Sequence, residues 1–204
     1  MHQFTVPMGL MDFVPVIFFA VTGVILLGDL YHRMSKGNFA LFAAGVVNVF
    51  TAGFLKALWK TLYAAGICDV VAFEQMFLPV NSLGLLFVGV AMIWMLCPKK
   101  KTVMLSVAPA PFVSGLPFIM MMVVGLGGMC AVLSILSAKM KKAPVMILFI
   151  ASFLLSMGMG YMSSQDSSLA WVNWVEQGIN TGSQLCLMIG TILLHRAGLG
   201  KAEA

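Results

Sequence analysis

The sequence consists of long apolar stretches interrupted only by short segments that carry Lys, Arg and turn-forming residues. A helix needs about 20 mostly apolar residues to cross the hydrocarbon core of a bilayer. Six stretches satisfy this length, and they lack the alternation of polar and apolar residues that marks barrel strands. They run from about Phe13 to Leu30, Phe39 to Leu62, Phe73 to Leu96, Leu116 to Ser137, Pro144 to Met162 and Leu169 to Leu194. The pattern predicts an all-α, polytopic membrane bundle.

The composition argues against a soluble domain. Only 9% of the residues are charged and 61% are hydrophobic, whereas soluble domains average about 25% charged residues. So few charges cannot cover a water-facing surface. The net charge of +5 does not indicate nucleic acid, because the basic residues lie in short clusters between apolar stretches. We expect a lipid bilayer as the surroundings and no nucleic-acid partner.

The first basic clusters give an orientation. No Lys or Arg precedes Phe13 and no small-residue cleavage site follows the first apolar stretch, so we expect no cleavable signal peptide. Arg33 and Lys36 come directly after that stretch. By the positive-inside rule, the N-terminus is outside and the first loop is cytoplasmic. We therefore expect a multi-pass protein of the cytoplasmic membrane.

The number of crossings depends on residues 102–115. If this segment stays on one side, the loop Lys and Arg residues divide evenly between the two sides of the membrane. If it crosses, all of them and the C-terminus are cytoplasmic: Arg33, Lys36, Lys99, Lys100, Lys101, Lys139, Lys141, Lys142, Arg196 and Lys201. Fourteen residues, half helical and half extended, span roughly 30 Å, about one hydrocarbon core. The charges favour seven crossings in a 3+1+3 arrangement, and six crossings with inverted halves is the alternative.

An internal repeat is consistent with this arrangement. A shift of half the chain length aligns residues 1–102 with residues 103–204. The aligned pairs include Pro15 with Pro117, Gly23 with Gly125, and Glu74-Gln75 with Glu176-Gln177. We therefore interpret the chain as one transmembrane domain built from two three-helix repeats.

Polar side chains are concentrated on the third and sixth stretches. Glu176 and Asn180 share one helical face with Gln184 beside them, and Glu74 and Asn81 lie seven residues apart. Because such groups are costly in lipid, we expect them to face the bundle interior and to line an outward-opening solute path. The alternative places both Glu residues at the outer interface and leaves the amides to bond neighbouring helices.

Lys56 and Lys60 lie one helical turn apart near the outer end of the second stretch. Snorkelling to the outer headgroups explains them without a function. The alternative pairs Lys56 with Glu176 or Glu74 inside the bundle, as a gate or an anion-attracting group. On that interpretation Lys56 belongs to the candidate path.

Smaller patterns predict local contacts. Ser152 and Ser156, and Gly178 and Gly182, are spaced by four residues, which is typical of close helix–helix seams. Asp29 and Arg33 have the spacing of a surface ion pair on one helix.

The residues for catalysis or metal binding do not occur in a recognisable arrangement. The three His residues show no H-x-x-x-H spacing, and the 4 Cys residues show no C-x-x-C. Phosphate-loop and nucleophile-elbow motifs are also missing. We expect no metal site, no cofactor and no enzymatic activity.

Two resemblances concern small-solute transport. The inferred 3+1+3 plan is similar to that of the sugar-facilitating SWEET and PQ-loop transporters, although the Pro-Gln pair of that family is missing from the first span of each half. The stretch W-V-N-W-V-E-Q-G-I-N-T, from Trp171 to Thr181, resembles the last span of the acid-activated urea channel family. Both resemblances imply transport of a small polar solute.

The sequence therefore favours a small-solute transporter or channel. The candidate path residues are Glu74, Asn81, Glu176, Asn180, Gln184 and Lys56. The alternative is a structural or regulatory subunit that transports nothing. Either kind of protein can assemble as a homo-oligomer or with a membrane partner.

Overall fold

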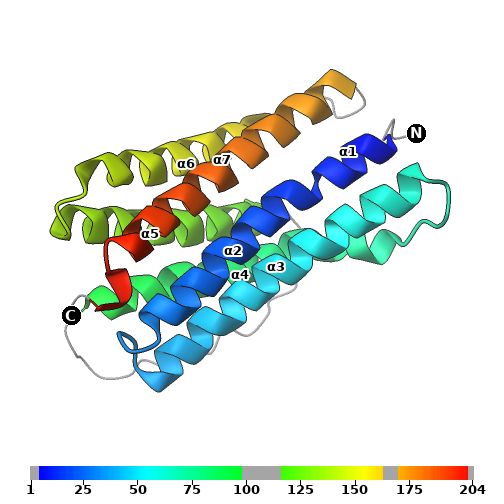
Figure 1. Ribbon diagram of the computed structural model, residues 1–204. Coiled ribbons are helices and arrows are strands. Elements are labelled where there is room, and N and C mark those ends of the chain that lie inside the picture. The colour runs from blue at the N-terminus through cyan, green and yellow to red at the C-terminus, as the bar shows by residue number, and fades with distance from the viewer. Residues whose placement is uncertain (1–4, 98–115, 163–169, 202–204) are drawn as a thin grey trace.

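The computed structural model describes residues 5–97, 116–162 and 170–201, and the regular structure in these ranges is helical (Figure 1). Each predicted apolar stretch forms one long helix, so the predicted helical bundle is confirmed. The elements are α1 (Val6–Met11), α2 (Phe13–Leu30), α3 (Lys36–Ala64), α4 (Val71–Leu96), α5 (Leu116–Lys139), α6 (Ala143–Met162), α7 (Ala170–Arg196) and the 3-10 helix η1 (Leu199–Lys201).

Four helical segments are long and apolar enough to cross a membrane. They are Val6–Leu30, which joins α1 and α2, and the helices α3, α4 and α5. Helix α6 is apolar over a shorter described length, Ala143–Met159. Helix α7 has 27 residues but is less apolar, because it carries the polar residues noted above.

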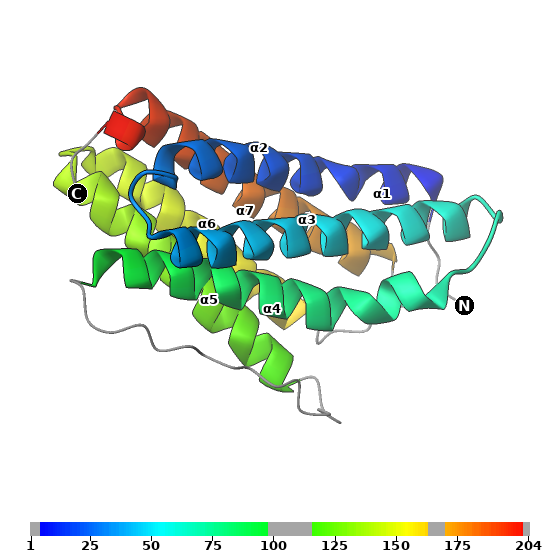
Figure 2. The ribbon, with the colours of Figure 1, turned by 90° about the horizontal axis from the view of Figure 1, so that it is seen from below.

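Consecutive long helices are neighbours, and α7 packs beside α2 (Figure 1). Helix α3 lies between α2 and α4 (Figure 2). Helices α4 and α5 run parallel, because Gly125 of α5 packs against Leu85 and Gly128 packs further along α4, against Ile93. Helix α4 therefore ends at one end of the bundle and α5 begins at the other. The predicted crossing segment, 102–115, lies outside the described residues.

Charge separates the two ends of the bundle. One end holds the close of α2, α4, α5 and α7 and the start of α3 and α6; we call it the basic end. Its described Lys and Arg residues are Arg33, Lys36, Lys139, Lys141, Lys142, Arg196 and Lys201. The opposite end, which we call the acidic end, holds Asp12, Asp69, Glu74 and Glu176, together with Lys56 and Lys60 of α3.

Glycines allow the closest helix approaches. A Cβ atom on Gly45 of α3 would lie 2.7 Å from the carbonyl oxygen of Gly84 of α4. Gly89 of α4 and Gly125 of α5 likewise bring their backbones into direct contact. The predicted seam at Gly178 is wrong, because that glycine faces open space. Sequence spacing alone marks a small residue but does not show whether a partner helix faces it.

The predicted serine seam joins α6 to α7. The Ser183 hydroxyl donates to the Ser152 carbonyl oxygen at 2.8 Å. Because one hydroxyl carries one proton, the 2.7 Å contact with Ser156 is a bond that Ser156 donates to Ser183. The hydroxyl groups of Ser156 and Ser183 therefore both donate hydrogen bonds within the α6–α7 pair.

At the basic end, polar contacts join α2 and the residue that follows it to the C-terminal segment. Asp29 is buried and its Oδ1 lies 2.9 Å from Nδ1 of His195 of α7. Arg33 donates to the Leu199 carbonyl oxygen at 3.3 Å. The expected Asp29–Arg33 pair is therefore replaced by contacts that reach the other end of the chain, a pairing that helix spacing cannot reveal.

The apolar core fills the half of the bundle nearer the basic end. It draws on the late parts of α2, α4, α5 and α7 and the early parts of α3 and α6. Its fully buried members include Leu26, Phe42, Leu133, Phe149 and Leu194. Tight packing therefore closes this half of the bundle.

Candidate functional site

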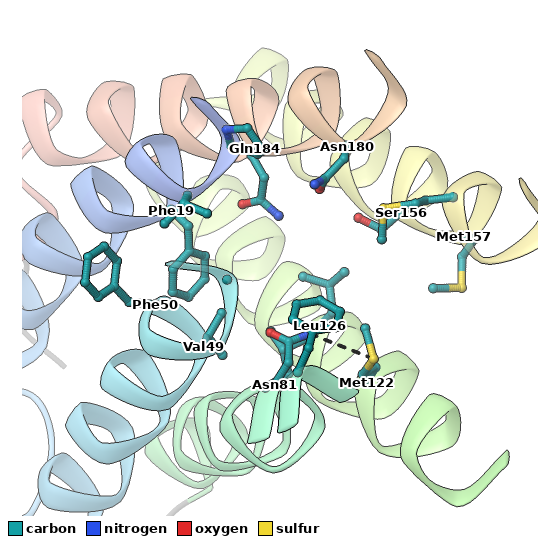
Figure 3. A pocket seen from close by; sticks show the side chains of 16 residues that line it. Phe19, Val49, Phe50, Asn81, Met122, Leu126, Ser156, Met157, Asn180 and Gln184 are labelled. Carbon is teal, nitrogen blue, oxygen red and sulfur yellow. Dashed lines mark hydrogen bonds between the residues drawn. The ribbon is translucent and has the colours of Figure 1, made fainter. Parts of the chain in front are cut away.

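A cavity of ≈ 130 Å³ lies where the core ends, in the half nearer the acidic end. All six long helices contribute to its wall (Figure 3). The lining residues are Pro15, Val16, Phe19, Val49, Phe50, Gly53, Phe77, Asn81, Leu85, Met122, Leu126, Ser156, Met157, Met159, Asn180 and Gln184. Because all six long helices line the cavity, the site forms only when the whole bundle is assembled.

The apolar core forms the floor of the cavity. Phe19, Val49, Leu85 and Leu126 belong both to the core and to the cavity lining. They come from α2, α3, α4 and α5, so the floor spans the bundle. The cavity is thus closed toward the basic end by close-packed side chains.

Amide side chains from α4 and α7 form the polar part of the wall. Asn180 and Gln184 are one turn apart on α7 and both point into the cavity, facing Asn81 of α4 (Figure 3). Asn81 donates a weak hydrogen bond from Nδ2 to the sulfur of Met122 at 3.9 Å. The Oε1 atom of Gln184 is buried and has no hydrogen-bond partner among the described residues. The wall therefore offers hydrogen-bonding capacity that the protein does not use up.

The backbone of α4 is unusual beside these amides. Pro79 lies inside the helix, between the lining residues Phe77 and Asn81. A proline lacks the N–H group that would bond the carbonyl four residues earlier, which locally weakens a helix. In the next turn the Ser82 hydroxyl donates to the Leu78 carbonyl, a side-chain bond that is common where helices bend. Helix α4 thus changes its hydrogen bonding at the level of the cavity.

Lys56 lies against the wall of the cavity from outside. Its Nζ atom is 4.0 Å from the centre of the Phe77 ring, a cation–π geometry, and Phe77 lines the cavity. The carboxylates of Glu176, Asp12 and Glu74 lie within electrostatic range of Lys56. Lys56 therefore contacts an aromatic ring and has both carboxylates and the cation Lys60 among its neighbours.

Lys60 belongs to the same group of charges at the acidic end. Its Nζ lies 2.9 Å from Oδ2 of Asp12, and the two side chains are only 10% and 14% exposed. Trp59 donates from Nε1 to Asp69 at 2.8 Å, which ties α3 to the connection before α4. Lys60 is thus an ion-pair partner within the bundle, rather than the snorkelling side chain that its position in the sequence suggests.

The predicted path residues divide into two levels. Asn81, Asn180 and Gln184 line the cavity, whereas Lys56, Glu74 and Glu176 do not. Each of the second set lies about one helical turn nearer to the acidic end than a lining residue of its own helix. The charged residues therefore lie between the cavity and the acidic end, and the amides form part of the cavity wall.

Sequence reasoning did not single out some lining residues. Ser156 was expected only in a helix seam, and it both joins that seam and lines the cavity. Met122, Met157 and Met159 also line it, and their apolar side chains give no signal that separates them from core residues.

Among the described residues, no group of His, Cys, Asp and Glu could hold a metal ion. No family model, curated protein or solved structure matches this chain.

Proposed function

We propose that this protein spans the cytoplasmic membrane and conducts a small polar solute through the centre of its helical bundle. The observation that carries the proposal is the cavity, because amides of α4 and α7 face a space to which all six long helices contribute. A concave, mostly apolar pocket with a few converging polar groups is the usual form of a small-molecule site.

Four long apolar helices support the membrane part of this proposal. The gathering of the described loop Lys and Arg residues at one end supports an orientation with that end in the cytoplasm. In this orientation the N-terminus is outside and the C-terminus is cytoplasmic. The apolar floor then closes the cavity toward the cytoplasm, which makes the cavity outward-facing.

The parallel course of α4 and α5 supports seven crossings. With α4 ending at the basic end and α5 beginning at the acidic end, the intervening chain joins opposite faces of the membrane in this orientation. An inverted pair of halves would instead give antiparallel α4 and α5. The proposed 3+1+3 plan, with repeats related by an axis along the membrane normal, has this parallel course.

The first test is solute flux into proteoliposomes made with the purified protein. Stopped-flow light scattering would follow re-swelling in ethylene glycol and in glycerol. We expect at least one of them to enter several-fold faster than it enters protein-free vesicles. The variant Asn180→Leu removes an amide from the cavity wall at similar volume and should reduce this rate.

The control is Thr51→Leu, which makes a similar change at an exposed position of α3. It should leave the flux unchanged. If folded wild-type protein admits neither solute faster than bare lipid, the transport proposal is wrong, and a non-transporting subunit becomes the better interpretation.

A further inference from the structure

The described lining of the cavity contains no charged side chain. Its polar groups are the amides of Asn81, Asn180 and Gln184 and the hydroxyl of Ser156. Uncharged amides cannot neutralise an ion, and an ion moved from water into apolar surroundings without a counter-charge pays a large desolvation penalty. The wall is therefore suited to uncharged molecules.

The charges near the cavity are already engaged with protein groups. Lys60 is paired with Asp12 at 2.9 Å, and Lys56 lies over the Phe77 ring at 4.0 Å. Phe77 is part of the cavity lining, whereas Lys56 is not. An ion inside the cavity would thus meet an aromatic ring, methionine side chains and amides.

Gln184 adds a requirement for a hydrogen-bond donor. Its Oε1 atom is buried without a partner among the described residues, while the side chain points into the cavity (Figure 3). An unsatisfied buried acceptor is unfavourable, so a molecule that donates a hydrogen bond to this amide, once the amide turns its oxygen toward the cavity space, is preferred to one that does not. Asn180, one turn away on α7, offers a second group to the same molecule.

The volume indicates the size of molecule that the cavity can hold. A water molecule takes about 30 Å³ in the liquid. A cavity of ≈ 130 Å³ therefore holds the equivalent of about four waters. Molecules of about four to six non-hydrogen atoms fit this space.

We infer that the cavity selects small uncharged solutes that donate hydrogen bonds, with Gln184 as the residue that determines this preference. The inference rests on the proposed transport function and specifies its substrate class. Short polyols and other O–H or N–H donors belong to this class, whereas cations and anions of the same size are excluded.

The experiment compares two probes of equal length, ethylene glycol and protonated ethanolamine, by tracer uptake into proteoliposomes with the membrane potential held at zero. In the wild type, we expect uptake of ethylene glycol above the protein-free level and no such uptake of the cation. Gln184→Met keeps the length of the side chain but removes the acceptor, and should slow ethylene glycol about 3- to 10-fold. Gln184→Glu places a negative charge in the cavity and should raise uptake of the cation to roughly tenfold above the protein-free level.

Gln75 provides the matched control, since it is an exposed residue of α4 that does not line the cavity. Gln75→Met and Gln75→Glu should leave both uptakes unchanged. Wild-type protein that admits the cation as fast as ethylene glycol would overturn the inference while transport itself stands, as would an unchanged rate in Gln184→Met. If ethylene glycol does not enter vesicles that contain folded protein, the inference is overturned, and if glycerol does not enter them either, the transport proposal is overturned as well.

Discussion

Asp12 and Lys60 are charged side chains placed where solvent has little access. They lie 2.9 Å apart, with 14% and 10% of their side-chain surfaces exposed. In such surroundings each charge depends on its partner, because a buried charge left alone is far more costly than either an exposed charge or a neutral pair. The pair joins the α1–α2 junction to α3, between the cavity and the acidic end.

Substitutions of Asp12 and Lys60 test the strength of this ion pair. Asp12→Leu and Lys60→Met should each destabilise the folded protein by about 3 kcal/mol, because each removes one member of a close ion pair from a site with little access to solvent. The double variant should lose less than the sum of the two single losses, with a coupling of about 1 kcal/mol or more. Thermal or denaturant unfolding in detergent measures all four members of the cycle, and strictly additive losses would show that the two groups do not interact.

The sequence revealed the amide residues of the site for a physical reason. Asn81, Asn180 and Gln184 interrupt apolar stretches, and an amide is costly against lipid, so an inward position could be predicted. The depth of the acidic residues could not be predicted in the same way. Glu74 and Glu176 lie in the turns before the cavity level, where a carboxylate can be either a path residue or an interfacial one.

At the scale of the helices, glycine determines how closely neighbours approach. Gly89 and Gly125 bring α4 and α5 into backbone contact, and Gly45 does the same for α3 against α4. Side chains there would separate the helices and enlarge the space between them. Apolar run length predicted the six long helices with bounds within three residues, but it did not predict α1. The pairing of the glycines could not be predicted either, because Gly178 has similar local spacing and faces open space.

Alanine substitutions at packed and unpacked glycines test these close approaches. Gly89→Ala and Gly125→Ala should each destabilise the protein by about 1–3 kcal/mol, because the new methyl group meets the backbone of the facing helix. Gly178→Ala has room for its methyl group and should be neutral or stabilising by up to about 1 kcal/mol, as expected from helix propensity. Unfolding temperatures measured in one detergent would rank the three variants, and equal effects at all three sites would contradict the packing described.

At the scale of the whole molecule, the apolar core occupies the half of the bundle nearer the basic end, and the cavity lies in the half nearer the acidic end. The core closes the basic end, and the cavity begins at Phe19, Val49, Leu85 and Leu126, where the core stops. The charge distribution in the sequence predicted the common direction of α4 and α5, since it required the loop Lys and Arg residues to share one side. The charge distribution did not predict which helices are neighbours. The order of helices around the bundle depends on how side chains fit together between segments far apart in the chain.

The most direct test uses two native cysteines as reporters of this arrangement. Cys68 lies near the acidic end and Cys97 near the basic end, and both are exposed. Variants that keep only one of them, and a third that carries Lys142→Cys in a cysteine-free background, would be treated in intact cells with a membrane-impermeant maleimide. We predict labelling of Cys68 from outside, and labelling of Cys97 and of position 142 only after the membrane is permeabilised. Labelling of position 142 from the same side as Cys68 would contradict the parallel course of α4 and α5, and with it the cavity that all six helices share.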